Sequence, residues 1–351
     1  MSVTIPHHNG HHIVFGAGLI GCYLGGALVL AKQNVTLVGR QRFLEQLSSQ
    51  YVISDYLGHR QVVSPLPDLM TIEQAEQKSL HADVLWLTVK CTALSEAIAD
   101  LRNCVDKNTI IICCQNGVST HQLLENAFPH NQVVRAMVPF NVVNDENGVF
   151  HRGSQGNMTL EVLPSLDEST KWLARQLSSD LLPVAITYHM TELQWSKLQL
   201  NLGNAVNAMA DIPVKKMLQT RLYRQFMALL MDELLMITEK QKIKLPKIAN
   251  LPNKWIPKVL RLPDVIFGLV AQKMIAVDPK VKTSMWWDLA QERKTEVDFI
   301  NGKIVEKAHS LELAVPANEW IVSLIHQAEQ GNRLSADKFK EAVAEFLQNR
   351  N

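Results

Sequence analysis

Short apolar runs alternate with longer amphipathic stretches through the first half of the chain. We predict strands over 12–15, 35–38, 84–89, 109–114, 133–138 and 158–162, with one more over 183–188. Between them, residues such as 22–30, 91–101 and 119–126 have the apolar spacing of helices. This alternation is typical of β-α-β units, so the fold class is α/β with a doubly wound parallel sheet.

The pattern changes after about residue 188, where long helical periodicity replaces the strand signals. We predict helices over 191–207, 217–242, 284–311, 317–329 and 336–348, the last capped at its N-terminus by Ser335. The sequence therefore predicts two domains, an α/β domain over 1–188 and an all-α domain over 189–351.

Residues 246–279 interrupt the helical half with prolines, apolar residues and lysines. Three structures suit such a stretch: a lid, an oligomer contact, or short helices packed on the core. The pattern alone does not choose among them.

Composition narrows the class of protein. A chain of 351 residues is long enough for two cores, and a net charge of +1 gives no electrostatic case for binding nucleic acid or an anionic membrane. No apolar run reaches the length of a membrane span. The five cysteines are odd in number and lack CxxC spacing, which predicts reduced thiols in a cytoplasmic protein. We interpret His7, His8, His11 and His12 as part of a disordered polar leader.

The stretch Gly16-Ala17-Gly18-Leu19-Ile20-Gly21 lies between a predicted strand and a predicted helix, the context that a dinucleotide-binding turn needs. The first glycine permits the turn, the second lets a pyrophosphate approach the backbone, and the third lets the helix pack on the strand. The helix start also offers N–H groups and a positive dipole end to phosphates. The alternative is a tight strand-to-helix turn without a ligand.

The residues after the second predicted strand indicate which dinucleotide the turn would bind. An NAD site usually carries an acid there for the ribose 2′-hydroxyl, but no acid occurs between Gly21 and Glu45. Arg40 and Arg42 occur instead, and guanidinium groups suit a 2′-phosphate. We predict NADP(H); the alternative is a pair of solvated loop arginines.

A second group of polar residues lies in the helical half. At about 100° per residue, Lys197, Asn201 and Asn204 share one helix face among leucines. This face is either simply solvated, or it directs Lys197 into a cleft. In a cleft, partial desolvation would lower the pKa of the lysine and suit it as a proton donor. The charged segment 293–298, which includes Glu296, is interpreted either as part of this site or as solvent-facing ion pairs.

Taken in order, these segments resemble the ketopantoate reductase (2-dehydropantoate 2-reductase) family across nearly the whole chain. The motifs that carry the resemblance are GAGLIG at 16–21, VGR at 38–40, VK at 89–90, QNG at 115–117, WSKLQLN at 195–201 and SM…TEVDFING from 284 to 302. Each motif is weak alone, but their joint order and spacing are specific.

The resemblance implies a Rossmann-type domain that binds NADPH, a helical domain, and a small 2-oxo acid bound between them and reduced in pantothenate synthesis. It implies that Lys197 protonates the keto oxygen and that Glu296 orients the substrate. It places Arg40 at the 2′-phosphate. The remaining implied contacts are Lys90 and Asn116 near the nicotinamide and substrate, and Asn201 and Ser284 at the substrate. A homodimer is compatible with the sequence.

The chain departs from the family pattern at two site positions. The family's second asparagine falls on Ala205, with Asn204 beside it, and a frequent polar cofactor contact is Ala93. These departures keep open a reductase of another small 2-oxo acid, and a non-catalytic NADP(H)-binding regulator is a further alternative. We expect no metal site, because His189 and His309 lack neighbours with ligand spacing.

Overall fold

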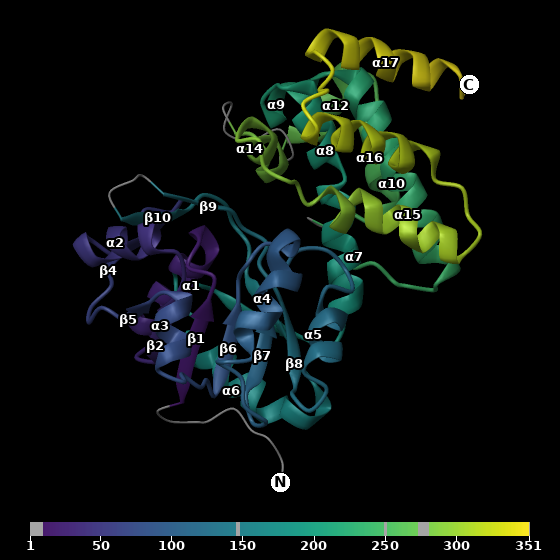
Figure 1. Cartoon of the computed structure of the whole chain (residues 1–351). Coiled ribbons are helices and arrows are strands. Elements are labelled where there is room, and N and C mark those ends of the chain that lie inside the picture. The colour runs from purple at the N-terminus through teal and green to yellow at the C-terminus, as the bar shows by residue number, and fades with distance from the viewer. Residues whose placement is uncertain (1–9, 145–147, 249–250, 273–280, 351) are drawn as a thin grey trace. The chain divides into compact units, whose positions relative to one another are not determined.

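The computed structural model describes residues 10–144, 148–248, 251–272 and 281–350. The chain divides into two compact units, Met1–Met190 and Thr191–Asn351 (Figure 1). Each unit has its own buried core and is described by itself below.

Eight strands of the first unit form one sheet in the order β12-β11-β8-β7-β6-β1-β2-β5. Their bounds are β1 His11–Phe15, β2 Asn34–Val38, β5 Asp68–Met70, β6 Val84–Leu87, β7 Ile110–Cys113, β8 Val133–Met137, β11 Met158–Glu161 and β12 Val184–Thr187. All neighbouring pairs are parallel except β8 and β11. The predicted sheet is thus confirmed, with one antiparallel pair. No helix occurs between β8 and β11 in the described residues, and a parallel crossover usually needs one.

Helices cover both faces of this sheet, because side chains alternate along each strand. Val14 and Trp86 lie in a buried cluster with residues of α1 and α6, whereas Ile13 and Leu85 lie in a second cluster with residues of α3, α4 and α5. These helices, with the more exposed α2, have the bounds α1 Leu19–Leu30, α2 Gln41–Ser49, α3 Ile72–Gln77, α4 Leu94–Leu101, α5 His121–Ala127 and α6 Asp167–Leu177. Two short 3₁₀ helices, η1 Cys91–Ala93 and η2 Pro164–Leu166, precede α4 and α6. The arrangement is the predicted doubly wound α/β fold.

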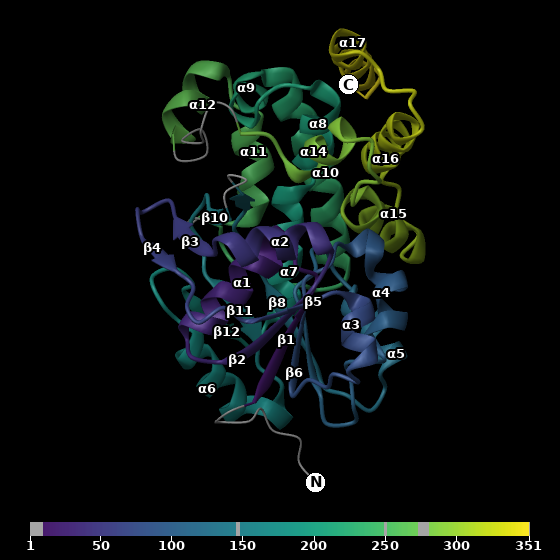
Figure 2. The ribbon, with the colours of Figure 1, turned by 60° about the vertical axis from the view of Figure 1, so that its left-hand side comes forward.

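A second, smaller sheet was not predicted. Its order is β4-β3-β10-β9, with the bounds β3 Val52–Asp55, β4 Arg60–Val62, β9 Val142–Asn144 and β10 Val149–Arg152. The central pair β3 and β10 is parallel and joins segments far apart in the sequence (Figure 2). Ile53 and Phe150 from this sheet pack into the same core cluster as α1.

The first strand begins one residue earlier than predicted and includes both His11 and His12. The interpretation of these two residues as a disordered leader is therefore wrong; His7 and His8 lie outside the described residues. His12 is buried, and its Nδ1 accepts a hydrogen bond from Trp86 Nε1 at 2.9 Å. Burial, with a smaller effect of His11, lowers the pKa of His12 to about 4, so the ring is neutral and can accept this bond.

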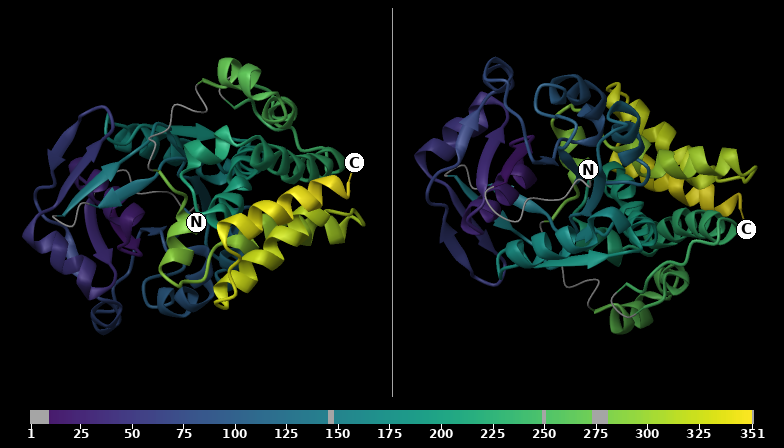
Figure 3. Two further views of the ribbon diagram at one scale, coloured as in Figure 1. Left: turned by 90° about the horizontal axis from the view of Figure 1, so that it is seen from above. Right: turned by 90° about the horizontal axis from the view of Figure 1, so that it is seen from below.

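The second unit is helical throughout its described residues, apart from an isolated bridge between Ile248 and Leu251. Its α-helices are α7 Met190–Asn201, α8 Gly203–Ala210, α9 Val214–Gln219, α10 Arg221–Lys240, α11 Ile256–Leu260, α12 Asp264–Val270, α14 Ser284–Ala290, α15 Asn301–Ser310, α16 Pro316–Glu329 and α17 Ala336–Gln348, and its 3₁₀ helices are η3 Asn253–Trp255 and η4 Val297–Phe299. Helices α16 and α17, in yellow in Figure 3, pack with α8 and α10. Ser335 Oγ accepts from Lys338 N, which confirms the predicted cap of α17.

Three of the predicted long helices are interrupted. The helix expected over 191–207 breaks at Leu202, and the one over 217–242 breaks at Thr220, whose backbone is extended. The helix expected over 284–311 ends at Ala290, where Glu292 follows with a φ of 52°, a left-handed conformation that α-helices do not contain. Helical periodicity continued across each break because buried apolar residues occur on both sides of it, such as Met285 and Ile304 on the two sides of Glu292.

The described part of 246–279 consists of short helices packed on α10. Arg224 of α10 is fully buried and donates to the carbonyls of Leu260 and Leu262 at 3.0 and 2.9 Å. It also pairs with Asp264 at 2.7 Å. Among the described residues, no helix combines the length and the apolar character that crossing a membrane requires.

Candidate active site

The glycine turn after β1 has the geometry that its sequence predicts. Gly16 has a φ of 107°, and a Cβ atom there would lie 2.8 Å from the backbone nitrogen of Val89. A Cβ atom at Gly21 would lie 2.2 Å from the carbonyl oxygen of Gly16, so only glycine lets α1 approach the turn this closely. Gly18 is different, because a Cβ there meets nothing nearer than 4.0 Å.

Gly18 is also the N-cap of α1. It has no side chain to accept hydrogen bonds from the first N–H groups of the helix, and the first turn contains no acid. Open space, exposed donors and a positive helix dipole together make this turn suitable for a phosphate group. Ala17, Leu19 and Ile20 complete the turn, and Ala17 is buried.

The end of β2 lies directly against this turn. Val38 O accepts hydrogen bonds from Gly16 N and Ala17 N at 2.9 and 3.0 Å. A Cβ atom at Gly39 would lie 2.4 Å from Ala17 Cβ, so the two backbones touch. Arg40 follows at once as the exposed N-cap residue of α2. The structure therefore places its backbone beside the glycine turn.

The second predicted arginine, Arg42, is also exposed, but its guanidinium carbon lies 4.8 Å from the centre of the Phe43 ring. This is a cation–π contact, and no such contact involves Arg40 in the described part of the chain.

The loops after β6 and β7 meet the glycine turn at the same sheet edge. Thr88 Oγ1 donates to Gly16 O at 2.8 Å, which ties the β6 end to the turn. Lys90 is exposed and caps η1, while Asn116 is half-buried in the loop after β7. Cys91 Sγ lies 3.2 Å from Asn116 O, so the two loops are in contact.

Sequence reasoning missed the residues that fix these loops. Gln115 is buried and its Nε2 donates to Leu87 O and Val89 O, each at 3.0 Å. Its Oε1 accepts from Cys113 Sγ at 2.9 Å. The sequence did carry a signal for this role. Gln115 directly follows an apolar strand and precedes an asparagine–glycine pair, and an amide buried at such a place needs several hydrogen-bond partners. Gln115 and Thr88 therefore position the loops that carry Lys90 and Asn116.

In the second unit, Lys197, Asn201 and Asn204 are half-buried on helices whose remaining residues are mostly buried. Lys197 and Asn201 lie on α7, and Asn204 lies on α8 beyond the break at Leu202. Ala205 is fully buried in the core, so Asn204 is the one of this pair that retains partial exposure.

A buried asparagine connects α8 to the start of α14. Asn207 is fully buried, and its Oδ1 accepts from both the backbone N and the Oγ1 of Thr283 at 3.0 Å. Thr283 is the N-cap of α14 and accepts from Trp286 N. Ser284, the first residue of α14, is exposed. The hydrogen bonds between Asn207 and Thr283 therefore place the segments that carry Asn204 and Ser284 next to each other. The sequence analysis identified neither Asn207 nor Thr283.

The segment around Glu296 is not a solvent-facing helix, and the interpretation of 293–298 as solvent-facing ion pairs is wrong for Glu296. Only 8% of Glu296 is exposed, and its neighbours Thr295 and Val297 are also buried. Glu329 of α16 accepts from Thr295 N at 2.7 Å, and Thr295 Oγ1 accepts from Val297 N at 3.2 Å. The loop thus holds a buried carboxyl group at a fixed position.

This loop is also connected to the α7–α8 break. Asn301, fully buried at the start of α15, donates through Nδ2 to Leu202 O at 3.4 Å and to Asn318 Oδ1 at 3.0 Å. Asn318 in turn donates to Glu233 Oε2 at 2.8 Å. The segment after Glu296 is therefore bonded to the α7–α8 break, and the start of α14 is bonded to α8.

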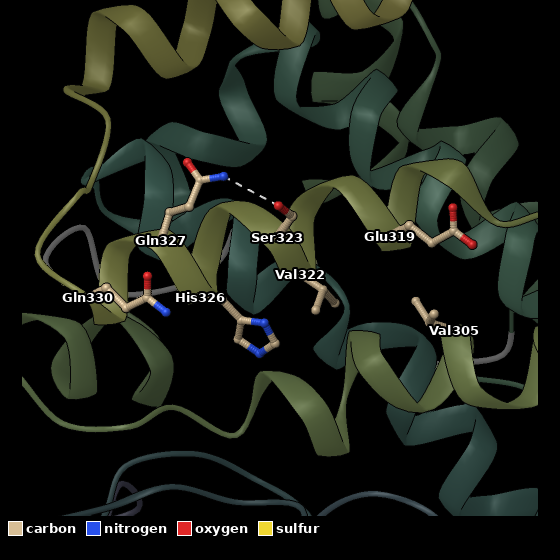
Figure 4. A pocket seen from close by; sticks show the side chains of 7 residues that line it. All are labelled: Val305, Glu319, Val322, Ser323, His326, Gln327 and Gln330. Atoms are coloured by element: carbon tan, nitrogen blue, oxygen red, sulfur yellow. Dashed lines mark hydrogen bonds between the residues drawn. The ribbon is translucent and has the colours of Figure 1, made fainter.

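A hollow of about 340 Å³ lies between α15 and α16 (Figure 4). None of the predicted site residues lines it, but His326 Nε2 lies 2.9 Å from Asp298 Oδ1, two residues beyond Glu296. In the described part of the chain, no group of three or more histidine, cysteine, aspartate or glutamate residues could hold a metal ion. None of the five cysteines takes part in a disulfide.

The family model "Ketopantoate reductase PanE/ApbA" matches residues 12–165, and the model "Ketopantoate reductase PanE/ApbA C terminal" matches residues 189–329. An uncharacterized oxidoreductase of Bacillus subtilis, YkpB, is 25% identical over 90% of this chain and 98% of its own length. A 2-dehydropantoate 2-reductase of Lactococcus lactis is 21% identical over 90% of this chain and 97% of its own.

Solved structures show the same fold. A PanE/ApbA family ketopantoate reductase from Ralstonia eutropha superimposes with a TM-score of 0.76 at 22% identity, covering 92% of this chain and 100% of its own. A D-mandelate dehydrogenase with NADH and anilino(oxo)acetate superimposes with a TM-score of 0.74 at 19% identity, with the same coverage.

Proposed function

Since the chain is an oxidoreductase of the ketopantoate reductase family, we propose that it uses NADPH to reduce a small 2-oxo acid, with 2-dehydropantoate as the first candidate. The observation that carries the proposal is the glycine turn, where the N–H groups at the start of α1 face open space at Gly18. Strand β2 supports this turn through hydrogen bonds from Gly16 N and Ala17 N to Val38 O, and Arg40 lies two residues beyond the end of β2. The retained Lys197 is the proton donor of this proposal, and Glu296 orients the substrate and supports the lysine.

The first unit fits a nicotinamide dinucleotide. The space at Gly18 and the free helix start suit its pyrophosphate, and Arg40 suits a 2′-phosphate because guanidinium groups pair well with phosphate. The related dehydrogenase structure contains NADH, so the choice of NADPH rests on Arg40 and on the lack of an acid after β2. Lys90 and Asn116, on loops tied to the turn, are assigned to the nicotinamide end.

The second unit is assigned to the substrate and to proton transfer. A bound NADPH supplies a hydride to the carbonyl carbon of the substrate. The Lys197 ammonium donates a proton from Nζ to the keto oxygen and stabilises the charge that develops there. Glu296 orients the substrate, while Asn201, Asn204 and Ser284 hold its carboxylate and hydroxyl groups. The product is the 2-hydroxy acid, and the lysine regains its proton from solvent.

Reduction of a different 2-oxo acid is the second candidate. Ala205 is buried where the family places an asparagine, so any amide contact would come from Asn204, one position earlier on the helix. The related dehydrogenase acts on an aryl-substituted acid, according to its name. A non-catalytic NADP(H)-binding regulator has less support, because a regulator would need neither Lys197 nor Glu296.

The test is NADPH oxidation with 2-dehydropantoate and, in parallel, a panel of other 2-oxo acids. A strong preference for 2-dehydropantoate supports the proposal and a role in pantothenate synthesis. Activity with another acid alone keeps the reaction and replaces the substrate. No activity with any acid, together with tight NADPH binding, would favour the regulator. The Lys197→Ala variant provides the blank for each acid.

A further inference from the structure

Helix α12 carries exposed apolar side chains that the proposed reaction does not use. Val265 is 80% exposed, Leu269 68% and Val270 61%, and Ile266 is exposed as well. At about 100° per residue these side chains fall on one side of the helix, whereas Phe267 is buried on the other. Single apolar residues are common on protein surfaces, but a group on one side of a helix marks an interaction site.

The buried side of α12 is fixed to α10. The guanidinium carbon of Arg224 lies 4.1 Å from the centre of the Phe267 ring, and Arg224 also pairs with Asp264 at the start of α12. The same guanidinium donates to Leu260 O at the end of α11. Because one residue of α10 holds both short helices by their buried sides, the exposed sides of α11 and α12 face away from α10.

The exposed side of η3 and α11 adds a tryptophan and two lysines. Trp255, Lys254 and Lys258 are exposed, and Lys258 Nζ lies 4.7 Å from the centre of the Trp255 ring. Helices α11 and α12 pack on each other (Figure 2). These three residues and the exposed apolar side chains of α12 together form what we call the α11–α12 face.

The segment that contains this face is strongly basic. The net charge of +1 is unevenly distributed along the chain, because no acid occurs between Glu239 and Asp264. The basic residues of this interval are Lys240, Lys242, Lys244, Lys247, Lys254, Lys258 and Arg261. Arg261 pairs with Asp232 at 2.6 Å, and Lys240 donates to a backbone carbonyl. Among the described residues no ion pair neutralises the remaining lysines, so their charge is available to a partner.

This charge decides between the partners that an apolar face fits. In a symmetric dimer the face would meet a copy of itself, so the lysines of the two subunits would lie close together and repel each other. A membrane with anionic lipids instead offers hydrocarbon directly beneath negative headgroups, which complements apolar side chains bordered by lysines. Tryptophan rings also favour the boundary between headgroups and hydrocarbon.

We propose that the α11–α12 face binds the surface of a membrane that contains anionic phospholipids. The apolar side chains of α12 enter the edge of the hydrocarbon, Trp255 lies at the headgroups, and Lys254 and Lys258 contact the anionic groups. The attachment is peripheral, because a helix of seven residues is too short to cross a bilayer. It involves none of the residues assigned to the reductase reaction and does not depend on that assignment.

The test is cosedimentation of the whole protein with vesicles of two compositions, phosphatidylcholine alone and equal amounts of phosphatidylcholine and phosphatidylserine. We expect binding to the mixed vesicles to be tighter by about tenfold or more, because each lysine near an anionic surface adds attraction. This binding should weaken as the salt concentration rises. Equal affinity for both vesicles, or no binding to either, would overturn the proposal.

The apolar part of the face is tested by Leu269→Glu. Because Leu269 is exposed, this variant should fold like the parent, and it should bind the mixed vesicles about tenfold more weakly or worse, since a carboxylate opposes both insertion and the anionic headgroups. The matched control is Val62→Glu on β4 of the first unit, where the valine is 66% exposed. The control should bind like the parent. Unchanged binding by Leu269→Glu would contradict the proposal.

The basic part is tested by the double variant Lys254→Ala/Lys258→Ala, which should bind the mixed vesicles about tenfold more weakly. Its control is Lys78→Ala/Lys107→Ala, which removes two exposed lysines of the first unit and should leave binding unchanged. Sedimentation velocity of the parent and of Leu269→Glu examines a second copy as the occupant. A dimer that Leu269→Glu dissociates, in a protein that binds neither kind of vesicle, would replace the membrane by a second copy of this chain.

Discussion

A Cβ atom at Gly21 would lie 2.2 Å from the carbonyl oxygen of Gly16, whereas one at Gly18 would meet nothing nearer than 4.0 Å. The two glycines therefore have different roles. Gly21 serves packing of α1 on the turn, and Gly18 leaves space over the helix start. Substitution by alanine should separate these roles.

We expect Gly21→Ala to lower the free energy of unfolding by more than about 2 kcal/mol, because the methyl group meets backbone that cannot move freely. Gly18→Ala should cost less than about 1 kcal/mol but weaken NADPH binding by about tenfold or more, because the methyl occupies the pyrophosphate approach. Urea denaturation and fluorescence titration with NADPH measure the two effects. Unchanged NADPH affinity in Gly18→Ala would argue that the turn binds no dinucleotide.

Arg40→Ala should weaken NADPH binding by about 10- to 100-fold, the typical effect of losing charged hydrogen bonds. NADH affinity should change little, since only NADPH carries the 2′-phosphate. The neighbouring Arg42→Ala is the matched control, because Arg42 is also exposed but lies over the Phe43 ring. Equal weakening of both cofactors by Arg40→Ala would make this residue structural instead.

Lys197→Ala should reduce kcat with the preferred 2-oxo acid by about 100- to 10,000-fold, the usual contribution of a general acid. NADPH affinity should be retained, because the glycine turn and Arg40 belong to the other unit. Steady-state kinetics with a separate cofactor titration tests this. Lys216→Ala, an exposed lysine of α9, is the control. If the Lys197 variant keeps full turnover, the lysine is not the proton donor.

Stability should fall at mildly acidic pH because of His12. Burial lowers its pKa from 6.5 to about 4 in the folded protein, so below pH 6.5 the unfolded chain binds more protons than the folded one. The sign is therefore a loss of stability as the pH falls, about 2 kcal/mol from this residue between pH 7 and pH 5.

His12→Asn isolates this effect, because its Oδ1 can still accept from Trp86 Nε1 but does not titrate. Urea denaturation at several pH values should show a shallower pH dependence in this variant than in the parent. The exposed His130→Asn is the control and should keep the parent slope. Parallel slopes in all three proteins would show that His12 does not carry the loss.

The sequence by itself determined the positions of seven of the eight strands of the large sheet, all but β5, together with the change to helices near residue 188 and the glycine turn. Each of these depends on local patterns: alternation along a strand, helical spacing, or backbone freedom at Gly16. The prediction of Lys197 and Asn201 came from the same kind of pattern, because one helical period relates them on α7, whereas Asn204 lies beyond the break at Leu202.

Only the tertiary structure decided which distant segments meet. Strand β3 pairs with β10, and Asn207 accepts a hydrogen bond from Thr283. Both contacts join residues far apart in the sequence, and no local pattern specifies such partners. The sequence pattern also did not predict the helix breaks at Leu202, Thr220 and Glu292. Apolar periodicity reflects which residues are buried, and buried apolar residues occur on both sides of each break, so the pattern continues although the helix does not.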